Sequence, residues 1–326
     1  MKFDAIVGNP PYQEDTGGGS AANVAAKQAR PVYNLFVDQA KTMQPHYISM
    51  IMPARWYAGG IGLNDFRNEM LNDPHLIRLT DFSDSNDCFP GVDIAGGVCY
   101  FLWDKSAHGE CKVISVHNGK QSISERKLNE YDTFIRFKEA ISIIKKIQLR
   151  ESKFYSERVS SQKPFGLRTY VKPTEGGDIK LRYSGGIGPF NRVDVTSGID
   201  WIDKWKVTMS YLTYDHAGRP DKNGQRRIFS TMDILPPEMV CTETYIVIDC
   251  FDTEQEAKNL MGYLKTRFVR FLVAQLAATQ HLSKATFGFV PVQDFTEEWT
   301  DEKLYKKYEL TEDEIAFIES TIRVME

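Results

Sequence analysis

Four consecutive residues near the start of the chain carry groups that could do chemistry: Asn9, Pro10, Pro11 and Tyr12. They follow residues 3–7, an apolar run typical of a strand. Proline lacks an N–H group and fixes φ, so the strand must end here in a rigid turn. The turn displays an amide side chain, a free carbonyl and an aromatic ring at the carboxyl end of a strand. Ligands bind at that edge of open α/β sheets, so we expect a binding site here.

The segment from Phe3 to Tyr12 resembles motif IV of the amino-methyltransferases that act on adenine N6 in DNA, in particular the gamma-type methylases of restriction–modification systems. An exocyclic amine is a poor nucleophile because its lone pair is delocalised into the ring. The resemblance implies that the Asn9 amide oxygen and the Pro10 carbonyl accept both N6 protons and localise that lone pair. S-adenosylmethionine then donates its methyl group directly, and Tyr12 stacks on an adenine flipped out of the duplex. The resemblance makes residues 9–12, including Pro11, the predicted catalytic motif.

The next segments must build the sheet that positions this motif. Residues 47–53 and 76–82 are short apolar strands, with a helical pattern at 63–71 between them. Such alternation predicts parallel strands joined by right-handed crossovers. Residues 98–104 look like the last, antiparallel strand of the methyltransferase core. The turn before it carries Phe89, which the resemblance implies packs against the target base. We expect an α/β fold: the C-terminal half of a class I, Rossmann-like methyltransferase sheet, followed by an α+β target-recognition domain.

Three regions are expected along the chain. Residues 1–118 form the partial catalytic core, and residues 119–150 form a connector with a helical pattern from 131 to 149. Residues 151–326 form the target-recognition domain, in which short β-like runs alternate with turns before C-terminal helices. Six basic side chains there are predicted DNA contacts, because Arg reads base edges and Lys holds phosphate. They are Arg219, Lys222, Arg226 and Arg227 in one basic loop, which an exposed hairpin tip would also explain, together with His281 and Lys284.

The donor site of the family is not evident. In gamma-type enzymes a Gly-rich turn and an acidic residue, which bind the donor, precede the motif. Here residues 3–7 are the only strand before Asn9, and the Gly-rich stretch at 17–19 follows no strand. The cofactor-binding residues are therefore unknown. Because the motif strand is central in the family sheet, we expect an apolar edge here. An N-terminal donor-binding segment or subunit, or a dimer, would cover it, or the chain is a fragment; alone it should be nearly inactive.

Composition sets broad limits. The chain has 326 residues, 42% hydrophobic and 26% charged, which suggests about two ordinary globular domains. Its five cysteines show no CxxC spacing, so we expect no zinc or other metal and a reduced protein. No leader pattern and no run of about 18 apolar residues is present, which favours a cytoplasmic protein without membrane contact. A net charge of −4 excludes a uniformly basic nucleic-acid binder, although residues 150–240 carry a small excess of Lys and Arg.

Three functions are compatible with these features. The first is site-specific methylation of adenine N6 in double-stranded DNA, within a restriction–modification enzyme. The second is a catalytically silent DNA-binding specificity module or remnant, which the absent donor site favours and the intact motif disfavours. The third is a protein glutamine methyltransferase, which shares the Asn-Pro-Pro-Tyr chemistry but usually lacks a large recognition domain. The motif could also be a strand that merely ends in a rigid turn. No PD…ExK carboxylate cluster of a nuclease is found.

Overall fold

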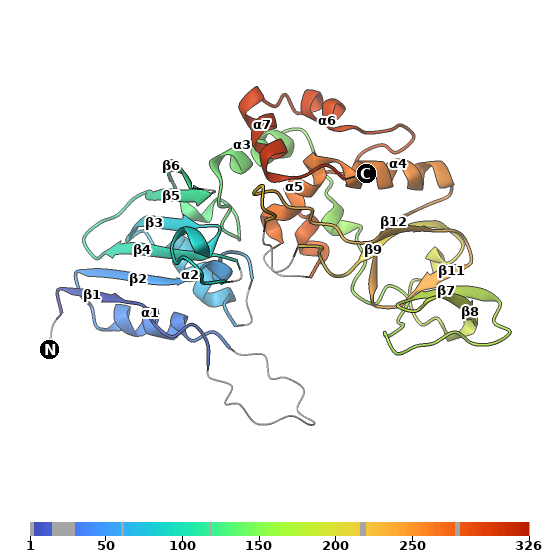
Figure 1. The fold of residues 1–326 in the computed structure, drawn as a ribbon, viewed down its shortest axis with the longest axis horizontal. Coiled ribbons are helices and arrows are strands. Elements are labelled where there is room, and N and C mark those ends of the chain that lie inside the picture. Colours follow the sequence, from blue (N-terminus) through green and yellow to red (C-terminus); the bar gives the residue numbers. More distant parts are fainter. Residues whose placement is uncertain are drawn as a thin grey trace. The chain divides into compact units, whose positions relative to one another are not determined.

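The computed structural model describes residues 3–14, 30–59, 62–94, 96–117, 119–215, 220–277 and 281–325. The Gly-rich stretch at 17–19 and Arg219 lie outside these ranges. The chain divides into two compact units, Met1–Lys138 and Glu139–Glu326. Both units combine helices with strands, so the predicted α/β class is confirmed at the level of a mixed α/β fold (Figure 1). None of the helices in the described ranges is long and apolar enough to cross a membrane.

The first unit, blue to green in Figure 1, is built on a six-stranded sheet with the order β1-β2-β4-β3-β5-β6. The strands are β1 (Ala5–Gly8), β2 (Tyr47–Pro53), β3 (Leu76–Phe82), β4 (Val98–Asp104), β5 (Cys111–His117) and β6 (Lys120–Arg126). Strands β1, β2, β3 and β5 run in one direction, and β4 and β6 run in the other. The antiparallel direction predicted for residues 98–104 is therefore confirmed. The carboxyl ends of β1, β2 and β3 meet at one edge of the sheet.

Apolar side chains at strand and helix spacing form the core of this unit. Alternate residues of β2, namely Ile48, Met50 and Met52, are buried. The helix α1 (Tyr33–Thr42) packs against β2 and buries Tyr33, Val37 and Ala40 on one face. A second helix, α2 (Asn64–Asn72), contributes further apolar side chains to the same core. The periods of two and of three to four residues thus place the polar face of each element outside.

Strand β1 lies at the edge of the sheet, with β2 as its hydrogen-bonded neighbour. Ile6 packs against the core, but Val7 is 79% exposed and Phe3 is 38% exposed. The apolar edge predicted from the sequence is therefore confirmed. An exposed edge of this kind offers unpaired backbone groups to another strand. What covers it stays a prediction.

The segment between the two units differs from the expected long helix. The helix α3 spans Lys138–Gln148, so the helical prediction for residues 131–137 is wrong. The N–H of Phe134 donates to the Tyr57 carbonyl at 2.9 Å, and the Phe134 ring is buried in the core of the first unit. These long-range contacts outweigh the helical spacing of the apolar residues. In addition, β6 lies in the range assigned to a connector, yet it pairs with β5.

The second unit contains two three-stranded sheets, with the orders β10-β9-β12 and β11-β7-β8. Its strands are β7 (Ile179–Tyr183), β8 (Gly186–Phe190), β9 (Trp205–Ser210), β10 (Met232–Leu235), β11 (Met239–Cys241) and β12 (Tyr245–Phe251). The helices after them are α4 (Glu254–Lys265), α5 (Arg267–Leu276), α6 (Asp301–Lys307) and α7 (Glu312–Thr321). The tail forms two helices, α6 and α7, because Glu309 between them adopts φ +50° and Thr311 caps α7.

Gly97, one residue before β4, is a position where the backbone requires glycine. Its φ is +79°, and a Cβ there would overlap the carbonyl oxygen of Phe82. We expect Gly97→Ala to lower the free energy of unfolding of the first unit by about 3 kcal/mol, from backbone strain and overlap together. Gly91 is the matched control, because its φ is +81° and a Cβ would meet nothing within 4 Å. Gly91→Ala should cost about 1 kcal/mol. Hydrogen exchange of first-unit amides measures both, and equal costs would contradict the argument.

Candidate functional site

Three segments converge at the carboxyl edge of the first unit's sheet. Residues 9–12 follow β1, the 3-10 helix η1 (Ala54–Tyr57) follows β2, and residues 83–89 follow β3. Strand β4 starts from the same edge, between β2 and β3. The topology therefore places the motif and the Phe89 turn at one edge of the sheet, where α/β folds bind ligands.

The four motif residues differ in exposure. Asn9 is exposed, and no described residue makes a hydrogen bond with its side chain. Pro10 is buried and Pro11 is exposed, while Tyr12 is half-buried. No backbone N–H in the described ranges donates to the Pro10 carbonyl. The buried proline anchors the turn, and the Asn9 amide has no competing partner among the described residues.

A backbone hydrogen bond holds Tyr12 in place. Its carbonyl accepts the N–H of Val32 at 3.3 Å, which ties it to the start of α1. Partial burial is the largest cause that raises the pKa of the Tyr12 phenol, and electrostatic interaction with Cys88 and Cys99 adds to the rise. A neutral ring suits stacking.

Ser85 determines the shape of the Phe89 turn. Its hydroxyl donates to the Val92 carbonyl at 2.7 Å and accepts the N–H of Ile94 at 2.9 Å. The Phe89 N–H donates to the Ser85 carbonyl at 2.7 Å. Ser85 is buried, whereas Phe89 is half-buried. A buried hydroxyl with two partners makes the turn rigid, so it presents the Phe89 ring in a defined position.

The structure contains a buried ionic group near this edge of the sheet that the sequence did not predict. Asp81, near the end of β3, is fully buried, and its carboxylate has no hydrogen-bond partner in the described part of the chain. Nη1 of Arg136 lies 3.5 Å from Asp81 Oδ1. Arg136 also bonds to the Gly96 carbonyl, and its Cζ lies 5.0 Å from the centroid of the Tyr57 ring. Burial raises the pKa of Asp81, and the Arg136 guanidinium opposes the rise. The signal available in the sequence was an acidic residue within the strand predicted at 76–82.

The residues of the basic loop that is predicted to contact DNA lie in different environments. Lys222 is exposed on a turn that the Asp221 carboxylate closes by accepting the N–H of Asn223 at 2.8 Å. Arg226 and Arg227 are half-buried, and the N–H of Arg226 donates to a backbone carbonyl of α7 at 2.8 Å. Lys222 therefore lies on an exposed tip, whereas the two arginines lie at its anchored base.

His281 and Lys284 are both exposed. The His281 ring stacks on Tyr211 with a centroid distance of 4.8 Å, and Lys284 begins the 3-10 helix η8 (Lys284–Phe287). Three residues after Tyr211, the ring of Tyr214 lies against Arg227, whose Cζ is 4.4 Å from the ring centroid. Residues 211–214 therefore connect His281 with Arg227, a grouping that sequence spacing could not show.

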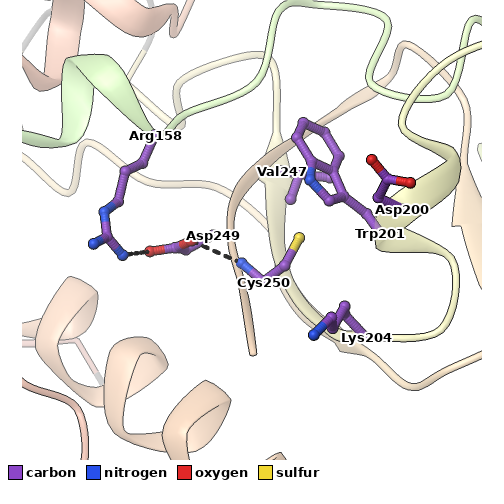
Figure 2. A pocket seen from close by; sticks show the side chains of 7 residues that line it. All are labelled: Arg158, Asp200, Trp201, Lys204, Val247, Asp249 and Cys250. Carbon is purple, nitrogen blue, oxygen red and sulfur yellow. Dashed lines mark hydrogen bonds and ion pairs between the residues drawn. The ribbon is translucent and has the colours of Figure 1, made fainter. Parts of the chain in front are cut away.

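The second unit also contains a pocket of about 340 Å³ (Figure 2). Figure 2 shows Arg158 reaching Asp249, with a hydrogen bond of 2.8 Å. The lining is Arg158, Asp200, Trp201, Lys204, Val247, Asp249 and Cys250. Two cationic and two anionic side chains balance each other, which does not favour the polyanionic backbone of DNA.

Lys206 pairs with Cys250 across β9 and β12 and is fully buried. Its Nζ donates to the carbonyls of Ile202 and Pro236 at 2.7 and 3.0 Å. Burial lowers the pKa of Lys206 from 10.5 to about 8. Between these two pH values the unfolded chain holds a proton that the folded chain lacks, so stability rises with pH in that window.

Lys206→Met should remove this rise. From pH 7.5 to pH 10 the free energy of unfolding of the native chain should gain about 2 kcal/mol relative to the variant. Urea denaturation of both proteins at the two pH values measures the difference. Parallel pH profiles would show that Lys206 does not titrate as described.

The described residues do not fit the methyl donor. The methylase resemblance implies S-adenosylmethionine, held by a Gly-rich turn after one strand and an acidic residue after the next. In the structure β1 is followed directly by Asn9 and β3 by Ser83, and the 3-10 helix η1 separates β2 from Gly59 and Gly62, so none of these three strands leads directly into a Gly-rich turn. We therefore assign donor contacts to none of them. Within the described ranges, no three His, Cys, Asp or Glu side chains lie close enough together to hold a metal ion.

Comparisons with known proteins show similarity to methylases. Residues 1–89 match the family model described as Eco57I restriction-modification methylase. An uncharacterized adenine-specific methylase of Mycoplasma pneumoniae is 36% identical over 137 residues, which are 41% of this chain and 31% of that protein. Two solved structures are more distant. The type IIG restriction endonuclease BpuSI has a TM-score of 0.39 at 11% identity, over 94% of this chain and 49% of its own.

The type IIL restriction-modification enzyme MmeI has a TM-score of 0.44 at 9% identity, over 87% of this chain and 46% of its own. The chain thus spans about a third of the curated relative and about half of each of the two enzymes. The resemblance predicted from the sequence is confirmed: the chain is similar to restriction–modification methylases, and residues 1–89 match the Eco57I family model.

Proposed function

We propose that this chain presents a flipped adenine in double-stranded DNA for methylation of its N6 amine, as part of a restriction–modification enzyme. The observation that supports this most directly is the Asn9 side chain. It is exposed and without a hydrogen-bond partner among the described residues, at the carboxyl edge of the sheet. It also lies within the segment that matches the methylase family.

The proposed roles follow from the chemistry of the groups. The Asn9 amide oxygen and the Pro10 carbonyl accept the two N6 protons, which localises the nitrogen lone pair. Tyr12 and Phe89 hold the base by stacking, since both rings are half-buried near the motif. Pro11 fixes the turn after the carbonyl. In this proposal the protein supplies preorganised acceptors at the position where charge develops.

We assign recognition of the target site to residues 151–326 and the acceptor site to residues 1–118, joined by residues 119–150. Lys222, His281 and Lys284 are exposed and able to reach DNA, whereas Arg226 and Arg227 act from half-buried positions. Arg219, outside the described residues, belongs to the same proposal. S-adenosylmethionine is the proposed donor. Since the described turns do not fit it, a donor-binding segment or subunit beyond the described residues is proposed to hold it.

Expression in a bacterial host without adenine methylation tests the proposal. The full chain is produced alone and together with the segment encoded upstream, and single-molecule sequencing then reads N6-methyladenine across the host DNA. We expect methylation at one defined site in the co-expressing cells and little or none with the chain alone. No N6-methyladenine in either culture, with both proteins folded, would overturn the proposal.

A catalytically silent DNA-binding specificity module is the second candidate. The misfit between the described strand ends and the donor favours it. The two candidates differ in what the motif does, because silent binding does not depend on the Asn9 amide. Site-specific DNA affinity of the full chain, without methylation under any condition of the experiment above, would select this second function.

A further inference from the structure

An exposed aromatic ring in the second unit carries two guanidinium groups. Tyr214 is 51% exposed. The Cζ atoms of Arg227 and Arg323 lie 4.4 and 5.1 Å from the centroid of its ring. Stacking on a common ring fixes the direction of both guanidinium groups. Arg323 comes from the C-terminal tail, about 100 residues away in sequence.

Backbone hydrogen bonds hold the three segments together. The Tyr214 N–H donates to the Ile228 carbonyl at 2.9 Å. The Arg226 N–H donates to the Thr321 carbonyl at 2.8 Å, and the Arg323 N–H donates back to the Arg226 carbonyl at 3.2 Å. The positions of the ring and both arginines are therefore determined by main-chain pairing. A preorganised site of this kind loses little conformational entropy on binding.

The two guanidinium groups have no carboxylate partner in the part of the chain that the structure describes. Asp215 is the carboxylate nearest in sequence to Tyr214, and it is already engaged. It accepts the backbone N–H of Arg227 at 3.0 Å and of Ile228 at 2.7 Å, and it lies 3.8 Å from Nε of Arg226. Nε of Arg227 is buried without a hydrogen-bond partner among the described residues. The pair thus retains unsatisfied donors and positive charge.

Further positive charge lies behind the pair. Arg270 is buried, and its Nη1 donates to the Arg227 carbonyl at 3.3 Å. Burial, as the largest cause, together with the charges of Arg267, Arg227 and Arg323, lowers the pKa of Arg270 to about 10, although the Asp301 carboxylate opposes the shift. Of these, Arg267 is neutralised by an ion pair of 2.9 Å with Glu319. The remaining arginines repel one another, so a bound anion would stabilise this region.

We propose that Tyr214, Arg227 and Arg323 form a clamp that binds a backbone phosphate of DNA. Guanidinium forks match the oxygens of a phosphate, and an exposed aromatic ring adds stacking contact with sugar or base. Three residues before Tyr214, Tyr211 stacks on the exposed His281 ring. The clamp rests on the proposed function, because it assumes that DNA is the partner. It adds the residues of the second unit that would contact the DNA backbone. Tyr214 and Arg323 were not among the predicted contacts.

The salt dependence of DNA binding tests the clamp. Fluorescence anisotropy measures the Kd of the full chain for a 30-bp duplex of the methylated site, or of mixed sequence, over a range of KCl concentrations. Each lost phosphate contact should reduce the slope of log Kd against log[KCl] by about 0.9. We expect this reduction and about tenfold weaker binding for Arg323→Gln and for Arg227→Gln. Tyr214→Ala should weaken binding, and Tyr214→Phe should retain it.

Arg192→Gln is the matched control, because Arg192 is held by Asp203 at 2.7 Å and should contribute no phosphate contact. Thermal unfolding of Arg323→Gln is compared with that of the native chain. An unchanged unfolding midpoint would show that the weaker DNA binding does not come from a loss of folding. If the native chain binds DNA but the clamp variants behave like Arg192→Gln, the clamp is wrong and the proposed function stands. If the native chain binds no DNA at any salt concentration, the clamp and the proposed function fail together.

Discussion

Asn9→Ala is expected to reduce the rate of N6-adenine methylation by about 10²- to 10³-fold in the complete enzyme, while DNA affinity stays unchanged. The substitution removes one of the two acceptors proposed for the N6 protons, so the nitrogen lone pair remains delocalised in the transition state. Asn9 is exposed, and its side chain bonds to no described residue, so the fold should not change. Loss of activity would then report on chemistry alone.

Asn9→Asp is the matched control for this test. It keeps an acceptor oxygen at the same position and should retain more activity than Asn9→Ala. The methylation rate is measured in single-turnover experiments, so that product release does not mask the chemical step. DNA affinity is measured in parallel by anisotropy. Full activity of Asn9→Ala would refute the proposed role of the amide. Equal DNA affinity of the native chain and Asn9→Ala, with no methylation by either, would favour the silent specificity module.

Arg136→Leu is expected to destabilise the first unit by about 3–5 kcal/mol. The variant leaves the Asp81 carboxylate buried without the guanidinium that now lies 3.5 Å away. It also removes the contact with the Gly96 carbonyl and with the Tyr57 ring. Hydrogen exchange of amides in β3 and β4 reports on this unit separately from the second.

The double variant Asp81→Asn with Arg136→Leu should recover much of this loss, because no buried charge remains. The pH dependence supplies an independent check. Folding raises the pKa of Asp81, so the protonated carboxyl adds to the free energy of unfolding below pH 3.8. This stabilisation is lost as pH rises through the folded-state pKa. Removing Arg136 raises that pKa further, so the single variant should lose less stability at pH 5 than at pH 7. A loss independent of pH would assign the effect to packing instead.

Local patterns in the sequence were sufficient for the elements that begin and end by local rules. The turn at residues 9–12 follows from two prolines after an apolar run, and β2 and β3 follow from short apolar segments. The direction of β4 and the exposed edge of β1 were also predictable, because the motif resembles a strand whose neighbours are known. The similarity of residues 1–89 to a methylase family was predictable from the same ten residues.

The features that depend on contacts between distant residues could be seen only in the tertiary structure. Residues 131–137 have helical spacing, but burial of Phe134 and the ion pair of Arg136 with Asp81 keep them out of a helix. The pairing of Tyr214 with Arg323 depends on a tail that returns across about 100 residues.

The periodicity of apolar residues predicts which side chains are buried, and the motif indicates which chemical groups a reaction needs. Neither pattern identifies the residue that pairs with a buried charge or with an exposed ring, because the packing of the whole unit determines that residue. The sequence by itself therefore determined which groups residues 9–12 display and which family the chain resembles, and the tertiary structure decided which distant residues lie together.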